Sequence, residues 1–220
     1  MIHDYEQQRK GKDGKQLENE GQEEIEPFLI GTPFRVVGRN TKGGSGEENR
    51  PIEVRKNLQV PSGSCPGDGM IDPDCDLVIY DSRDYQVLMA IHVRMNLREV
   101  EKNYHWVDRM RKYTPTSHIG HIILTADVDK QLGLSPLKSN GKIRKQRDTL
   151  FLYDATYVMR EYNICESPRL LNKETSKFDT LIVRPFSKFN EEIVNRLIHN
   201  GKVDFSELRT SLITVCSFHN

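Results

Sequence analysis

Two short apolar runs separated by a polar turn constrain the fold of this chain more than any other feature. Both lie within residues 72–98, which read DPDCDLVIYDSRDYQVLMAIHVRMNLR. The first run is Leu77–Tyr80 and the second is Val87–Ile91, and turn-forming residues 81–84 lie between them. Short runs rich in β-branched residues and bounded by turn formers are typical of strands. We therefore expect two adjacent strands joined as a hairpin.

Acidic and basic side chains lie at one end of this predicted hairpin. Asp74 and Asp76 precede the first strand, and His92 and Arg94 follow the second apolar run. Side chains two residues apart on a strand share a face, so each of these two pairs is expected to point one way. Carboxylates at a strand end are suited to Mg²⁺, whose bound waters can attack a phosphate. A neighbouring cation would stabilise the charge that develops on that phosphate.

The stretch resembles the core of type II restriction endonucleases of the PD-(D/E)xK nuclease superfamily. In that family a P-D-x-D-hydrophobic strand precedes a strand of the form A-I-(S/E)-x-K and a helix that begins S-L-R-E-R. The matching residues are Pro73–Tyr80 and Ala90–Glu99, and the resemblance extends over residues 70–160. It implies a restriction-endonuclease-like α/β fold, in which helices flank a mixed central β-sheet. It also implies double-stranded DNA as the substrate, Mg²⁺ as the cofactor and a homodimer that acts on short palindromes.

The resemblance also implies roles for individual residues. Asp76 would be the primary metal ligand, and Asp74 a supporting or alternate ligand. Arg94 occupies the position of the family's lysine, and His92 the position of its carboxylate or serine. Arginine stays protonated, so Arg94 is expected to neutralise a phosphate but not to deprotonate water. His92 is expected to bind a metal or accept a proton.

Three functions therefore stay open. The first is a Mg²⁺-dependent, site-specific DNA endonuclease. The second is a catalytically impaired DNA-binding relative or regulatory subunit, because Arg94 and His92 replace the usual residues. The third is a structural α/β protein in which the two aspartates merely cap a turn.

Candidate site residues also occur outside the hairpin. Leu17, Gly21, Ile25 and Phe28 recur near the helical period, and Pro27 limits where that helix ends. Related nucleases often carry a glutamate on an early helix that reaches the metal from the side. Glu18 is the candidate for this role, and a solvated surface acid is the alternative.

Basic residues provide candidates for contact with DNA. Residues 137–147, LKSNGKIRKQR, form the most basic window of the chain and contain no acid. Within it, Lys142, Arg144 and Lys145 are candidate phosphate contacts, and a solvated surface loop is the alternative. Arg98 matches the arginine of S-L-R-E-R and begins a helix predicted over residues 97–112, with Asn96 as its N-cap.

Other patterns predict the remaining elements. Strands are expected at residues 33–38, 118–125, 150–159 and 178–183, a helix at residues 191–199 closed by Gly201, and an edge strand or dimer element at residues 212–216. The glycine-containing stretch 39–50 is expected to be a surface loop. It is not expected to be a phosphate cradle, because it has neither Walker-type spacing nor a following helix.

Composition sets the remaining bounds. The 220 residues have zero formal net charge, so any basic surface must be local. Four dispersed cysteines without a C-x-x-C pair argue against a zinc site or disulfide framework and fit a reducing cytoplasm. The sequence contains no run of membrane-spanning length and no apolar signal core near its start. We expect one nuclease-like domain over residues 1–220, with residues 1–15 flexible and the core at residues 70–160.

Overall fold

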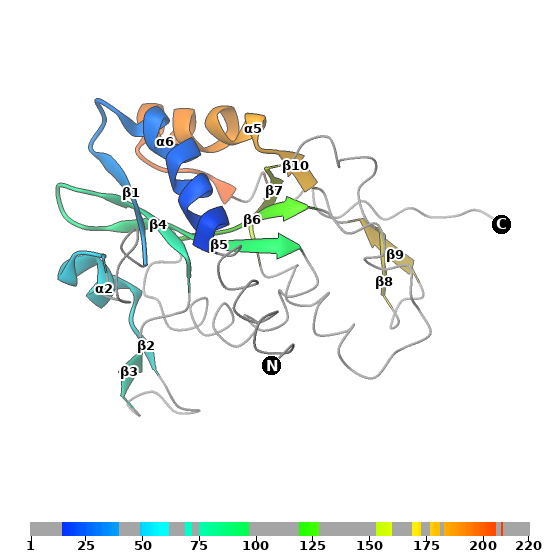
Figure 1. The fold of residues 1–220 in the computed structure, drawn as a ribbon, viewed down its shortest axis with the longest axis horizontal. Helices are drawn as coiled ribbons and strands as arrows, with labels where there is room; N and C mark the ends of the chain where they lie inside the picture. Colours follow the sequence, from blue (N-terminus) through cyan, green and yellow to red (C-terminus); the bar gives the residue numbers. More distant parts are fainter. Residues whose placement is uncertain are drawn as a thin grey trace, which may run out of the picture.

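A mixed six-stranded sheet forms the centre of the molecule (Figure 1). The structure, a computed structural model, describes residues 15–39, 49–61, 69–71, 75–96, 119–127, 153–159, 169–172, 177–180, 183–205 and 208. The strand order is β1-β4-β5-β6-β7-β10. These strands are β1 (Phe34–Gly38), β4 (Leu77–Asp81), β5 (Val87–Asn96), β6 (Gly120–Asp127), β7 (Ala155–Val158) and β10 (Val183–Pro185). The pairs β1–β4 and β4–β5 are antiparallel, whereas β5, β6, β7 and β10 run parallel.

Two small sheets and several helices complete the described part of the fold. The small sheets pair β2 (Val60–Pro61) with β3 (Met70–Ile71) and β8 (Arg169–Asn172) with β9 (Lys177–Thr180). The helices are the segment 15–25, the 3₁₀ helix η1 (Glu26–Leu29), α2 (Ile52–Leu58), α5 (Ser187–Phe189), the π-helical η4 (Asn190–Val194) and α6 (Asn195–Asn200). The predicted α/β fold, a mixed sheet flanked by helices, is confirmed. The single strand expected at residues 178–183 is instead divided between β9 and β10.

Helices from both ends of the chain cover one face of the sheet (Figure 1). The segment 15–25 and the α5–η4–α6 helix pack there on a core that includes Ile79, Ile91 and Tyr157. Full burial of each such apolar side chain contributes about 1.5–3 kcal/mol. The expected helical period is seen in Leu17, Gly21 and Ile25, which are all buried. Phe28 departs from the period and is 39% exposed, because the chain tightens into η1 around Pro27 and Leu29 takes the buried position.

Gly21 brings the first helix close to the sheet. A Cβ atom at this position would lie 2.9 Å from Leu124 Cδ2 on β6 and 3.4 Å from Leu77 Cδ1 on β4. The absence of a side chain therefore lets the helix lie directly over β4 and β6, the two strands that flank β5.

Substitution of Gly21 is expected to test this close approach. Gly21→Leu should lower the free energy of unfolding by about 1–3 kcal/mol, because the added side chain would overpack the helix–sheet contact. The same change at the exposed Glu24, on the same helix, should alter stability by less than about 0.5 kcal/mol. Urea unfolding of both variants measures the difference, and equal midpoints would contradict the packing described here.

A short helix on the other face of the sheet was not expected. We expected no helix after the glycine-containing stretch 39–50, and this is wrong, because α2 begins directly after Pro51. Val54 and Leu58, four residues apart, are fully buried and pack with Val78 and Ala90 on this face. The i, i+4 spacing after a proline was the available signal.

The helix predicted at residues 191–199 is confirmed, although the helical segments α5, η4 and α6 begin earlier, at Ser187. It ends at Gly201, which adopts φ 68° and donates its N–H to Leu197 O at 2.8 Å. A glycine in this left-handed conformation is a common helix stop. The helix predicted at 97–112, the basic window 137–147 and the element predicted at 212–216 lie outside the described residues.

Candidate active site at the end of the hairpin

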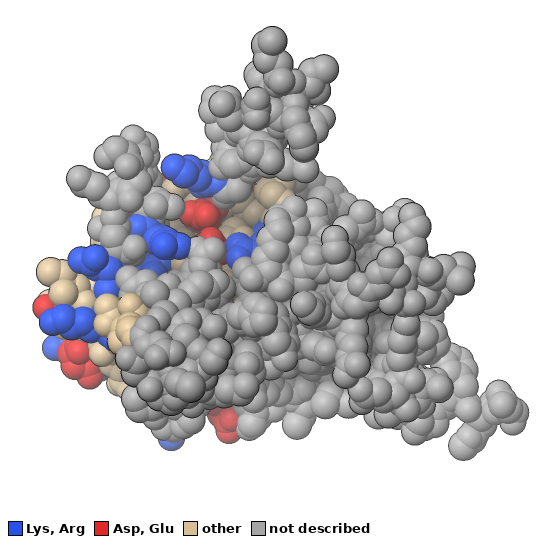
Figure 2. Space-filling view, turned by 90° about the horizontal axis from the view of Figure 1, so that it is seen from below, with Lys and Arg blue, Asp and Glu red and all other residues tan. Residues whose placement is uncertain are grey.

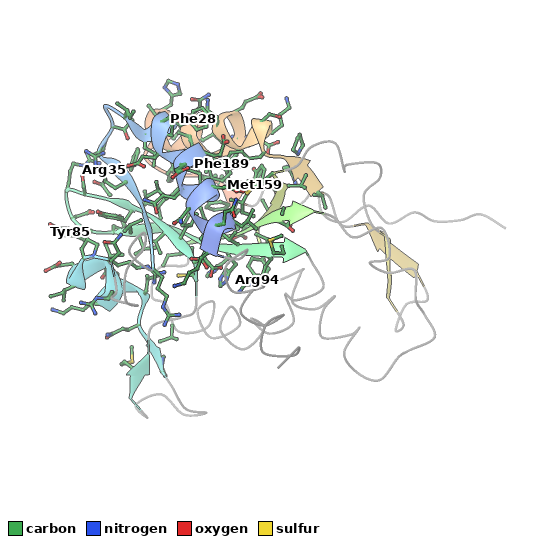
Figure 3. All side chains as sticks on the ribbon, viewed as in Figure 1. Phe28, Arg35, Tyr85, Arg94, Met159 and Phe189 are labelled. Atoms are coloured by element: carbon green, nitrogen blue, oxygen red, sulfur yellow. The ribbon has the colours of Figure 1, made fainter. Side chains whose placement is uncertain are left out.

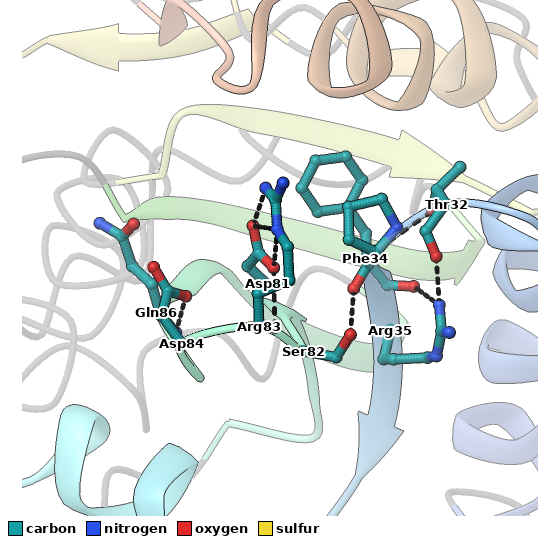
Figure 4. A network of polar contacts seen from close by, with 9 residues as sticks. Thr32, Phe34, Arg35, Asp81, Ser82, Arg83, Asp84 and Gln86 are labelled. Atoms are coloured by element: carbon teal, nitrogen blue, oxygen red, sulfur yellow. Dashed lines mark hydrogen bonds and ion pairs between the residues drawn. The ribbon is translucent and has the colours of Figure 1, made fainter.

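A network of polar contacts fixes the turn between β4 and β5 (Figure 4). Asp81 accepts hydrogen bonds from the Arg83 guanidinium and from the backbone N–H of Arg83 at 3.0 Å, and these bonds lower the pKa of the Asp81 carboxyl. Ser82 Oγ donates to Pro33 O at 2.6 Å, which ties the turn to the start of β1. A turn held in this way sets the pairing of the strands, and Leu77 lies opposite Ile91.

The resulting register places Asp76 beside the end of β5. The backbone N–H of Asp76 donates to Ile91 O at 3.0 Å. The Asp76 side chain then accepts two hydrogen bonds at Oδ2, from the Val93 N–H at 2.7 Å and from Arg94 Nη1 at 2.8 Å. Both side chains are largely buried, Asp76 with 13% and Arg94 with 16% exposure. The structure thus brings together one of the predicted carboxylates and the predicted cation.

The two faces of β5 differ in character. Met89, Ile91 and Val93 belong to the core under the helices. The alternate residues Ala90, His92 and Arg94 lie on the opposite face of the strand. Figure 3 shows Arg94 on the other side of the sheet from Phe189.

His92 is fully buried on the site face. Its ring contacts the ring of Tyr153 edge-on, with centroids 5.3 Å apart and planes inclined by 82°. His92 and Arg94 therefore share a face as predicted, but His92 packs inside the protein. The alternation of the strand gave no indication of Tyr153 as its neighbour.

Polar groups continue from β5 across the neighbouring strands. Thr125 on β6 pairs with Arg94 and is fully buried. Asp154 Oδ2, directly before β7, accepts the His121 N–H at 2.7 Å. Arg94 and Thr125 lie near the carboxyl ends of two parallel strands, where ligands bind in open α/β sheets. Asp154 and His121 instead lie at the amino-terminal ends of β7 and β6, at the opposite edge of the sheet.

A buried arginine supports the backbone next to Asp76. Arg50 is 3% exposed, and its Nη2 donates a hydrogen bond to the carbonyl oxygen of Cys75. Arg50 lies 25 residues before Cys75, so no local pattern could have revealed this contact. Figure 2 shows acidic side chains of the described residues lying between groups of basic side chains on the face seen from below.

Comparison with known proteins identifies the family of this chain. A family model described as BsaWI restriction endonuclease type 2 matches residues 51–184, more than half of the chain. The chain belongs to this restriction endonuclease family. No curated protein matches the sequence. The matched region contains β4, β5, β6 and β7, and it includes both Asp76 and Arg94.

The described residues fit a metal ion only in part. A carboxylate held by a backbone N–H is a fixed oxygen donor of the kind that Mg²⁺ prefers. Within the described residues, no group of three His, Cys, Asp or Glu side chains is arranged to hold a metal. Glu18 lies on the first helix one turn before Gly21 and is partly buried. Asp74 and the candidate DNA contacts lie outside the described residues, namely Arg98, Lys142, Arg144 and Lys145.

Among the described residues, no helix is both long and apolar enough to span a membrane.

Proposed function

We propose that this chain is a Mg²⁺-dependent type II restriction endonuclease that hydrolyses phosphodiester bonds at a specific site in double-stranded DNA. The supporting observation is the convergence of the Asp76 carboxylate and the Arg94 guanidinium within the region matched to the family. Both groups lie at the end of the sheet where ligands bind in open α/β folds.

Asp76 is the proposed primary ligand of Mg²⁺, with Asp74 as a supporting or alternate ligand and Glu18 as a third donor from the first helix. When bound, Mg²⁺ supplies positive charge and an activated water. The Val93 N–H holds Asp76 Oδ2 in one position, and Arg50 holds the neighbouring Cys75 carbonyl. A preorganised carboxylate needs little rearrangement as charge develops.

Arg94 is proposed to bind the scissile phosphate, because a guanidinium forms charge-assisted hydrogen bonds with phosphate oxygens and stays charged. His92 is proposed as a positioning residue at the position of the family's acid or serine. Its complete burial against Tyr153 favours support of the β5 end over direct contact with substrate.

The remaining proposals concern DNA contact and assembly. Arg98, Lys142, Arg144 and Lys145 are proposed to contact backbone phosphates and so contribute affinity without sequence preference. We further propose a single domain over residues 1–220 that acts in the cytoplasm as a homodimer on a short palindrome. The dimer is proposed because the nucleases that this chain resembles commonly act as homodimers. The cytoplasm is proposed because the four dispersed cysteines fit a reducing compartment.

A second candidate function has one specific observation in its favour. Arg94 occupies the lysine position of the family and is paired with the carboxylate expected to bind metal. Such a pair is compatible with a DNA-binding relative that has lost cleavage.

Incubation with a large phage DNA separates the candidates. The endonuclease proposal predicts discrete fragments in Mg²⁺ and none in EDTA. Intact DNA together with binding that weakens as salt rises would support the impaired relative, because phosphate contacts release counterions. DNA affinity that is insensitive to salt would contradict both proposals and favour a structural role.

A further inference from the structure

A metal ion bound to Asp76 would have to displace or tolerate a cation that already contacts this carboxylate. Asp76 Oδ2 lies 2.8 Å from Arg94 Nη1, and the Val93 N–H holds the same oxygen at 2.7 Å. Both charged side chains are largely buried, so water screens their attraction less than it screens an exposed pair. A divalent cation on Asp76 would add a second positive charge beside the guanidinium.

The competition between a metal ion and residue 94 for Asp76 persists because residue 94 is an arginine. A lysine in this position could lose its proton when a metal approaches, but the arginine guanidinium keeps its charge. Repulsion between Arg94 and a metal ion on Asp76 is therefore relieved only when Arg94 finds another anion.

The edge of the Arg94 guanidinium formed by Nε and Nη2 shows how such an exchange can occur. Arg94 Nη1 donates one hydrogen bond to Asp76 Oδ2 and another to Val93 O at 2.6 Å. Towards the part of the chain that the structure describes, the edge formed by Nε and Nη2 makes no hydrogen bond. A guanidinium presents paired donors that match two phosphate oxygens. A DNA phosphate can therefore engage Arg94 before the contact with Asp76 is given up.

We propose that Arg94 is an internal counter-ion that keeps Asp76 from binding a divalent cation until a DNA phosphate takes over the guanidinium. This inference rests on the proposed metal-dependent function and adds a mode of regulation to it. It makes metal binding and DNA binding cooperative, and each must raise the affinity for the other by the same factor. Such a device would keep the chain from holding an activated metal in the absence of its substrate.

Binding of Mn²⁺, followed by the electron paramagnetic resonance signal of the free ion, tests this proposal without cleavage as the readout. Without DNA, Arg94→Met should bind Mn²⁺ about tenfold or more tightly than wild type, a typical size for coupling between sites. Long duplex DNA at low salt should raise the Mn²⁺ affinity of the wild type by a similar factor and leave that of Arg94→Met nearly unchanged. Arg94→Gln, which also lacks the charge but can still donate to Asp76, should behave like Arg94→Met.

Two variants serve as controls. Arg83 forms the corresponding ion pair with Asp81 in the turn of the same hairpin, so Arg83→Met removes the same charge away from the site and should bind Mn²⁺ like wild type. Asp76→Asn reports the Mn²⁺ that binds to DNA or elsewhere on the protein. Circular dichroism verifies that each variant is folded.

The possible failures are distinguishable. If wild type binds Mn²⁺ through Asp76 but neither Arg94 variant binds it more tightly, the counter-ion proposal is overturned and the proposed function stands. If wild type and both Arg94 variants match Asp76→Asn with and without DNA, Asp76 holds no metal and both proposals are overturned.

Discussion

Replacement of Asp76 by asparagine is expected to abolish the Mg²⁺-dependent DNA cleavage that is proposed for this chain. The amide oxygen can still accept the Val93 N–H, but it lacks the charge that attracts a divalent cation. Loss of a single preorganised electrostatic group commonly slows an enzyme by about 10²–10³-fold, and loss of a metal ligand should cost at least that. The initial rate of conversion of supercoiled plasmid to nicked and linear forms measures the effect.

A matched control comes from the same hairpin. Asp84 is an exposed acid in the turn, where its carboxylate accepts the Gln86 N–H at 3.0 Å. Asp84→Asn should therefore cleave at the wild-type rate. Cleavage by Asp76→Asn at the rate of Asp84→Asn would show that the chemistry lies elsewhere in the chain.

Replacement of Glu192 by alanine is expected to cause a large loss of stability. Glu192 Oε2 accepts a hydrogen bond from the Tyr157 hydroxyl at 2.7 Å and lies 3.1 Å from Arg184 Nε. These three side chains join β7, β10 and the π-helical segment η4. Burial and the nearby Glu192 carboxylate raise the pKa of Tyr157 well above its usual value, so its hydroxyl stays protonated and donates. Loss of the carboxylate from this largely buried pair should lower the free energy of unfolding by about 3 kcal/mol.

The adjacent residue provides the comparison for Glu192. Glu191 also forms an ion pair, with Lys188 at 3.2 Å, but both side chains are mostly exposed. Glu191→Ala should change the free energy of unfolding by about 0–1 kcal/mol. Urea unfolding monitored by tryptophan fluorescence or circular dichroism distinguishes the two variants, and a Glu192→Ala midpoint within error of that of Glu191→Ala would refute the role given to the buried network.

The sequence was sufficient to predict the hairpin and the meeting of Asp76 with Arg94. Apolar runs of strand length identified β4 and β5, and the short turn left little freedom in how they pair. Asp76 directly precedes one strand and Arg94 lies near the end of the other, so antiparallel pairing brings them together. The helix over residues 15–25 followed equally from the spacing of its buried residues.

Other parts of the site depend on contacts that a local pattern does not contain. Arg50 reaches Cys75 from a distant segment, and Tyr153 reaches His92 from the segment just before β7. The helix α2 has only seven residues and two buried positions, which is too few for a convincing period. The burial of His92 was also not evident, because alternation gives the face of a strand but not what packs on that face.

The most direct test of the proposed active site is a crystal structure of the chain bound to duplex DNA in Ca²⁺ or Mn²⁺. The account predicts a metal ion on the Asp76 carboxylate and the Arg94 guanidinium on a phosphate of the DNA. A complex in which DNA and metal are bound while Asp76 still pairs with Arg94, with the metal held by other residues, would contradict it.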